Sequence, residues 1–117
     1  MVNFVLADAV MNAIEANPAQ HDQAWWAEKT PCGTTMCFAG WTVTVAGAKL
    51  VWSKDQESTS LCIDSEGKEH YIEVYAEGLL ELSPAESLKL FYSCDNFEEL
   101  REALEEMKEA SAELVGV

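Results

Sequence analysis

Apolar side chains recur at helical spacing near the start of the chain. The positions that share one face are Leu6, Val10, Ala13 and Ile14. Intervals of three and four residues are typical of an amphipathic helix with one buried side. Asn17-Pro18 follows, and the residue before a proline avoids the helical region. The pattern therefore predicts a helix over residues 3–16 that ends before Pro18.

The next segment predicts short elements. Residues 21–26 fit a single helical turn, with Asp22 as its N-terminal cap. Residues 29–33 (Lys-Thr-Pro-Cys-Gly) are predicted to form a loop.

A long uncharged stretch in the middle of the chain predicts a buried helix. We expect this helix to begin at Thr34 or Thr35 and to run to about Ala48. No charged residue occurs from Thr34 to Ala48, and a helix that is apolar all round is a buried one. Gly40 costs such a helix about 1 kcal/mol relative to alanine. We therefore expect another element to approach Gly40 closely, with Trp41 packing beside it. Gly47 is placed to end the helix.

Residues 49–75 change to β-branched and aromatic types. Three runs have this character: residues 50–52, 61–63 and 71–75. Residues 64–68 (Asp-Ser-Glu-Gly-Lys), between the last two runs, have the composition of a turn. The pattern predicts a β-hairpin or a three-stranded antiparallel sheet.

Helical patterning returns after Ala76. Ser83-Pro84 with Glu86 combines a serine cap, a proline at the first helical position and a glutamate three residues after the cap. Asp95-Asn96 is predicted to cap a final helix. The side chains expected to face inward are Leu88, Phe91, Tyr92, Phe97, Leu100, Leu104 and Met107.

Length and composition fit one domain. The chain has 117 residues, of which 49% are hydrophobic, enough for one modest core. We predict an α+β domain over residues 1–117, with a buried central helix, flanking helices and a small antiparallel hairpin or three-stranded sheet.

The charge is strongly negative and unevenly placed. The chain has 21 acidic and 7 basic residues, a net charge of −14. Seventeen of the acids lie after residue 53. Such a chain repels nucleic acid phosphates and anionic lipids, so we expect neither direct nucleic acid binding nor membrane binding. The expected partner is a protein with a basic surface. The candidate contact residues on the final helix are Glu102, Glu105, Glu106 and Glu109.

The four cysteines do not form a recognisable metal motif. Cys32 and Cys37 are separated by four residues, and Cys62 and Cys94 have no close cysteine partner. We expect no metal and no cofactor; the alternative is a zinc site from His21, Cys32 and Cys37. The N-terminal residues resemble no export signal and no run approaches the roughly 18 apolar residues of a membrane span. We therefore expect a cytoplasmic protein with reduced thiols.

The adjacent tryptophans at positions 25 and 26 are candidate binding residues. We expect one of Trp25 and Trp26 to point outward, where it could anchor an interface. No phosphate-binding loop or Ser-His-Asp set occurs. A Cys32–His21 nucleophile is conceivable, since Cys32 precedes a predicted helix start, but no oxyanion motif accompanies it. The sequence therefore favours a protein that is not an enzyme.

The segment from Cys32 to Trp41 (Cys-Gly-Thr-Thr-Met-Cys-Phe-Ala-Gly-Trp) resembles a group of small proteins encoded by actinobacteria and their phages. They share a C-G-T-x-x-C-x-A-G-W core after a short helix and a tryptophan-containing segment. The positions that carry the resemblance most specifically are Cys32, Gly33, Thr34, Cys37, Gly40 and Trp41. The resemblance covers most of the chain and implies a phage or actinobacterial origin. It implies no particular mechanism, and no catalytic residue carries over from the group.

These observations together favour a phage-type accessory protein that binds, and thereby modulates or inhibits, a host protein through its acidic surface or an exposed tryptophan. One alternative is a small-ligand or zinc-binding module that uses residues 32–41. Another is a DNA mimic, in which the acidic final helix occupies a nucleic-acid-binding protein. The sequence predicts neither the partner's identity nor the oligomeric state.

Overall fold

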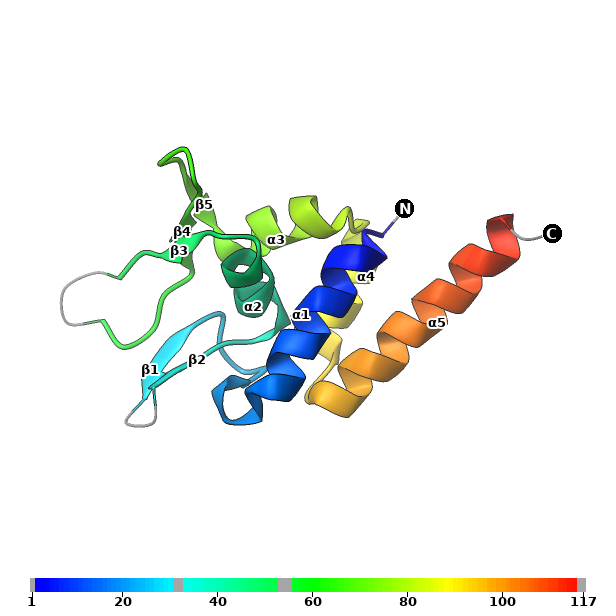
Figure 1. The fold of residues 1–117 in the computed structure, drawn as a ribbon, viewed down its shortest axis with the longest axis horizontal. Helices are drawn as coiled ribbons and strands as arrows, with labels where there is room; N and C mark the ends of the chain where they lie inside the picture. Colours follow the sequence, from blue (N-terminus) through cyan, green and yellow to red (C-terminus); the bar gives the residue numbers. More distant parts are fainter. Residues whose placement is uncertain (1, 31–32, 53–55, 116–117) are drawn as a thin grey trace.

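The computed structural model describes residues 2–30, 33–52 and 56–115, with side chains up to residue 112 (Figure 1). Its first helix, α1 (Phe4–Ala16), confirms the predicted one. The Asn3 side chain accepts a hydrogen bond from the Leu6 amide at 3.1 Å and begins the helix. The Asn3 amide donates to the Leu80 carbonyl at 2.7 Å, so the start of the chain is tied to a distant helix.

The segment after α1 is not the helical turn that the sequence predicts. A short 3₁₀ turn, η1 (Pro18–Gln20), is followed by a parallel bridge between His21 and Met36. The Met36 amide donates to the Gln20 carbonyl, and the Asp22 amide donates to the Met36 carbonyl, both at 3.0 Å. The prediction for residues 21–26 is wrong because these backbone groups pair with a segment fifteen residues away, which local propensity does not reveal.

Residues 33–35 form a strand, although the sequence places two of them in a helix. Strands β1 (Glu28–Thr30) and β2 (Gly33–Thr35) pair antiparallel. Residues 57–59 extend the pairing, since the Lys29 amide donates to the Glu57 carbonyl at 2.6 Å. The predicted helix start at Thr34 or Thr35 is therefore wrong, because both residues pair with β1 instead. Pro31 and Cys32 of the predicted loop lie outside the described residues.

The predicted central helix exists but is shorter. Helix α2 (Phe38–Val45) is buried through residue 43 and packs against α1 and α3. Gly47, at a φ of 97°, follows its end as predicted. A Cβ built on Gly40 would lie 2.0 Å from the carbonyl oxygen of Trp26, so the expected close approach is confirmed. The Trp41 indole donates to the Gln20 carbonyl at 3.0 Å and fastens α2 to η1.

The predicted three-stranded sheet is confirmed, with a shorter last strand. Its order is β3 (Lys49–Leu50), β4 (Leu61–Ile63), β5 (Glu69–Tyr71), all antiparallel. Helix α3 (Ile72–Leu80) begins directly after β5. The prediction of strand for residues 72–75 is wrong because Ile72, Ala76 and Leu80 share a buried helical face.

The C-terminal half confirms both predicted caps. Ser83 and Glu86 form the capping box of α4 (Pro84–Leu88). The Asn96 side chain accepts from the Glu99 amide at 2.9 Å at the start of α5 (Phe97–Val115). Between these helices lies a π-helical turn, η2 (Lys89–Ser93).

Two side chains near η2 point the other way from the prediction. Leu88 and Tyr92 are 59% and 55% exposed, while Leu90 and Phe91 are buried. The buried positions here are Ser87, Leu90, Phe91 and Cys94. Their intervals of three and four residues define a buried face that is offset from the predicted one, so Leu88 and Tyr92 lie outside it.

The described residues form an α+β fold with one apolar core cluster. In Figure 1 the two small sheets lie at one end of the molecule, and α1, α4 and α5 lie at the other. Lys108 of α5 pairs with Asp8 of α1 at 2.7 Å. None of the helices in the described ranges is both long and apolar enough to cross a membrane.

Replacing Gly40 with alanine is expected to destabilise the fold by about 1–3 kcal/mol, because the new methyl group meets a backbone oxygen that cannot move cheaply. Intrinsic helix propensity alone would favour alanine by about 1 kcal/mol. Gly78→Ala in α3 is the matched control, since a Cβ there has no neighbour within 4 Å. Urea unfolding of both variants tests this: a Gly40→Ala protein as stable as the Gly78→Ala protein contradicts the contact.

Candidate functional site

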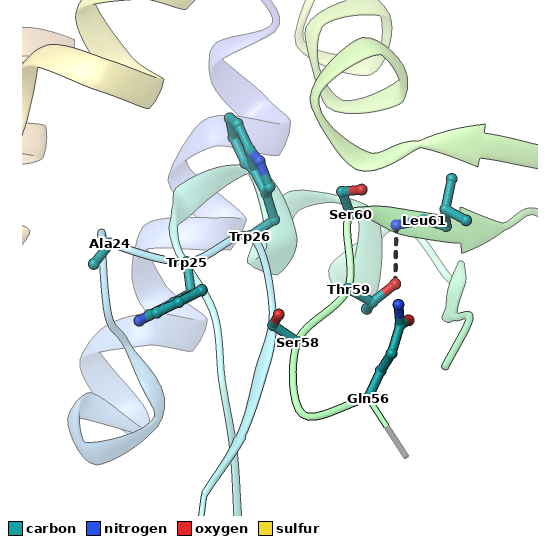
Figure 2. Close-up of a pocket in the computed structure, with 8 residues that line it drawn as sticks. All are labelled: Ala24, Trp25, Trp26, Gln56, Ser58, Thr59, Ser60 and Leu61. Atoms are coloured by element: carbon teal, nitrogen blue, oxygen red, sulfur yellow. Dashed lines mark hydrogen bonds between the residues drawn. The ribbon is translucent and has the colours of Figure 1, made fainter. Parts of the chain in front are cut away.

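The Trp25-Trp26 backbone is held in place while one of its rings faces outward. The Trp25 carbonyl accepts from the Cys37 amide at 2.8 Å, and the Trp26 carbonyl lies against Gly40. Trp25 is 45% exposed, whereas Trp26 is half-buried. As the sequence analysis expects, one of the two tryptophans points outward, and it is Trp25. In Figure 2 the two rings project in different directions from adjacent residues.

A first hollow, called here the polar hollow, lies on one side of this pair (Figure 2). Its volume is about 490 Å³. Gln56, Ser58 and Ser60 contribute polar groups to its lining, together with the two tryptophans. The Thr59 hydroxyl is already engaged, since it donates to the Val51 carbonyl at 2.6 Å. The hollow combines an aromatic wall with polar hydroxyl and amide groups.

A second hollow, called here the aromatic hollow, lies on the other side and shares the two tryptophans. Its volume is about 330 Å³. The Trp26 ring stands perpendicular to the rings of Phe91 and Tyr92, with centroids 6.1 and 5.6 Å away. Asp95 adds a carboxylate at its edge. The hollow therefore brings the tryptophan segment together with η2 and the start of α5.

Gln23 joins the elements that surround the aromatic hollow. Its side-chain oxygen accepts from the Phe38 amide at 2.7 Å and lies 2.9 Å from Nε2 of His21. Its side-chain nitrogen donates to the carbonyls of Leu90 and Cys94 at 3.3 and 3.1 Å. The Gln23 amide thereby satisfies a backbone N–H group in the first turn of α2 and two carbonyls of the η2 region.

The Cys32–His21 nucleophile considered from the sequence lies outside the described residues, because they do not include Cys32. The three described cysteines are all buried. Cys37 lies at the N-terminal cap position of α2, and burial raises the pKa of its thiol to about 11, although the amides of Gly40 and Ala39 oppose the shift. A thiol with that pKa is a poor nucleophile at neutral pH. Cys62 and Cys94 are also buried, with pKa values raised by desolvation.

The alternative zinc site is only partly visible. His21 contacts the Gln23 side chain, and Cys37 is buried. Cys32, its third ligand, lies outside the described residues. Within the part of the chain that the structure describes, no group of three or more His, Cys, Asp or Glu side chains is arranged to hold a metal ion.

The hairpin turn before β5 contains an arrangement that the sequence analysis does not anticipate. His70 Nε2 lies 2.7 Å from Oδ2 of Asp64, and the Tyr75 ring stacks on His70 with centroids 4.3 Å apart. The amides of Glu66 and Lys68 donate to the other Asp64 oxygen. The hydrogen bond from His70, followed by the Lys68 amide, lowers the pKa of Asp64. This cluster stabilises the turn rather than forming a reaction site.

The acidic candidate residues lie on the exposed side of α5. Glu102, Glu105, Glu106 and Glu109 are all exposed. Among the described residues, the ion pairs are Arg101–Glu98, Lys108–Asp8 and His70–Asp64. These four glutamates therefore have no ion-pair partner in that part of the chain.

The acidic residues of α5 and the two tryptophans do not line a common pocket. The link between them is Asp95, which lines the aromatic hollow and lies two residues before α5 begins. The sequence analysis missed Gln23, Tyr92 and Asp95 as site residues. Their placement depends on which face of η2 is buried and on long-range hydrogen bonds, and no local motif marks either feature.

In a Cys32→Ser variant, the three remaining thiols are expected to react much more slowly with a thiol reagent in the native state than in denaturant. Burial and their raised pKa values cause the delay. In denaturant, without prior reduction, we expect three reactive thiols in this variant and four in the parent chain. Only two reactive thiols in the denatured parent chain would instead reveal a disulfide.

The chain matches no known protein-family model, no curated protein and no solved structure.

Proposed function

We propose that this protein is a non-enzymatic binding protein that captures a partner protein with a basic surface. The observation that carries the proposal is a row of exposed glutamates on α5 that have no ion-pair partner among the described residues: Glu102, Glu105, Glu106 and Glu109. Opposite charge on a partner would steer encounter towards this face. The resemblance to actinobacterial and actinophage proteins would place the partner in a bacterial host.

The magnitude of the charge supports a binding role. A net charge of about −2 to −8 is enough to keep a small domain soluble, whereas this chain has −14. Self-repulsion of that size destabilises the folded state. A basic partner would neutralise part of it, so the excess negative charge favours complex formation.

Trp25 supplies a second contact of a different kind. Its backbone is anchored by the Cys37 amide, and nearly half of its surface is exposed. Tryptophan is enriched among the residues that carry interface energy, because it buries a large rigid surface at a small entropic cost. We assign steering to α5 and short-range attachment to Trp25.

The polar hollow favours a second candidate function, binding of a small ligand. Its volume of about 490 Å³ falls within the roughly 300–1,000 Å³ typical of ligand pockets. Ligand-dependent thermal shifts that disappear in a Ser58→Leu variant, with no protein partner present, would favour this function over partner capture.

Affinity capture followed by mass spectrometry would identify the partner, and association kinetics would then test the acidic face. The association rate is expected to fall several-fold from low to high salt, as screening shortens the Debye length to about 10 Å at 0.1 M. Replacing all four glutamates with glutamine should slow association more than it speeds dissociation. The substituted positions are Glu102, Glu105, Glu106 and Glu109.

The matched control removes the same charge elsewhere. Four exposed glutamates away from the outer face of α5 serve this purpose: Glu15, Glu66, Glu69 and Glu81. If the four-glutamine variant of α5 and this control associate equally fast, the face contributes only net charge, and its assignment as the steering surface is wrong.

Trp25→Ala is expected to raise the dissociation rate at least several-fold while leaving the salt dependence of association unchanged. The ring is exposed, so its removal should cost little folding stability, which thermal unfolding would verify. Tyr71→Ala is the control, because Tyr71 is also exposed but lies on β5. Equal dissociation rates for the Trp25→Ala protein and the parent protein would exclude Trp25 from the interface.

A further inference from the structure

The aromatic hollow is formed in advance by elements far apart in the sequence. Its walls come from residues 23–26, from the start of α2 and from the η2–α5 junction. Gln23 hydrogen-bonds to Phe38, Leu90 and Cys94 and thereby holds these three elements together. A site whose walls are already fixed loses little conformational entropy when it is filled.

The hollow is lined by four aromatic side chains, those of Trp25, Trp26, Phe91 and Tyr92. The Trp26 plane makes angles of 90° with Phe91 and 87° with Tyr92. Aromatic faces carry negative partial charge, and a cation within about 6 Å of a ring centroid is attracted to it. Tyr92 and Trp25 remain about half exposed, so both could contact an incoming group.

The charge around the hollow has the sign that a cation requires. Asp95 lines it, and among its eight described lining residues there is no lysine or arginine. Desolvation and, next, a hydrogen bond between the Tyr92 side chain and Glu73 of α3 raise the pKa of Tyr92 to about 12. The phenol therefore stays neutral at physiological pH, and Glu73 and Asp95 both contribute negative charge near the hollow.

We propose that the aromatic hollow binds an arginine side chain on the partner's basic surface. A planar guanidinium can stack on an aromatic face while its N–H groups reach a carboxylate, here Asp95. A lysine ammonium is more strongly hydrated and offers no planar face. This proposal deepens the proposed function by naming the group that the hollow would bind. It rests on that function only in taking the partner to be a basic protein.

The experiment uses free amino-acid derivatives, so it needs no partner. N-acetyl-arginine amide is titrated into the ¹⁵N-labelled full chain at constant chloride, and the indole N–H signals of Trp25 and Trp26 are followed. Saturable shifts of these signals are expected. N-acetyl-citrulline amide, neutral and nearly the same shape, should bind about tenfold more weakly or not at all, the size of a partly desolvated cation–π contact. N-acetyl-lysine amide should lie between the two.

Charge-matched variants separate the hollow from the general negative field. Asp95→Asn should weaken arginine binding several-fold, whereas Glu109→Gln, which removes the same charge on the distal part of α5, should not. Tyr92→Ala should abolish the saturable shifts, and Tyr92→Phe, which keeps the ring, should retain them. If the alanine variant misfolds by circular dichroism, the Asp95→Asn and Glu109→Gln comparison decides alone.

Three results would overturn the inference: equal binding of citrulline and arginine derivatives, tighter binding of lysine, or equal effects of Asp95→Asn and Glu109→Gln. Its failure is distinguishable from failure of the proposed function. The partner's salt-dependent association through α5 can persist when the hollow takes no arginine, and the hollow can bind arginine when the glutamates of α5 prove irrelevant to the partner.

Discussion

The contact between the Trp26 carbonyl and Gly40 determines where the tryptophan segment lies, and with it the two hollows that this segment lines. The oxygen occupies the space that a side chain at residue 40 would need, so the tryptophan segment can lie directly on the most deeply buried helix. The adjacent bond from the Cys37 amide to the Trp25 carbonyl fixes the same segment at a second point. Because the backbone is held this closely, the Trp25 ring is exposed while the half-buried Trp26 ring packs against Phe91 and Tyr92, and both residues line the two hollows.

A polar network around the partly buried Gln23 side chain fixes the elements next to this contact. Gln23 links the start of α2 to the carbonyls of Leu90 and Cys94, and its hydrogen-bonding groups are matched by partners. Removing one member of such a network leaves buried groups unsatisfied, which is more costly than the net gain of any single bond. The η2 turn therefore has a defined position, with Phe91 in the core and Tyr92 at the surface.

The shape of the molecule accommodates its charge. The described chain extends 53 Å along its longest axis and 29 and 22 Å along the others, and Figure 1 shows α5 reaching away from the body towards the C-terminus. Acidic side chains on such a helix are spread along its length and are well solvated, which reduces their mutual repulsion. The apolar side of the helix, with Leu100, Ala103 and Leu104 buried, still attaches it to the core.

Some features of this protein are determined locally and could be predicted from the sequence: α1 and its end before Pro18, the capping box at Ser83, the cap at Asn96, and the turn between β4 and β5. Each depends on side chains within about four residues of the backbone groups that they satisfy. Gly40 was predictable for a related reason, since a glycine inside an apolar helix is unfavourable unless something occupies the space.

The tertiary structure decided the rest. Residues 21–26 and 33–35 are not helical because the first segment pairs with Met36 and the second pairs with β1. Tyr92 faces outward because the buried face of this segment passes through Leu90, Phe91 and Cys94. Asp95 lines the aromatic hollow because Gln23 hydrogen-bonds the carbonyls of Leu90 and Cys94 beside it. These outcomes depend on hydrogen bonds between residues that are distant in the chain. The free energy of such bonds cannot be predicted from a local sequence pattern.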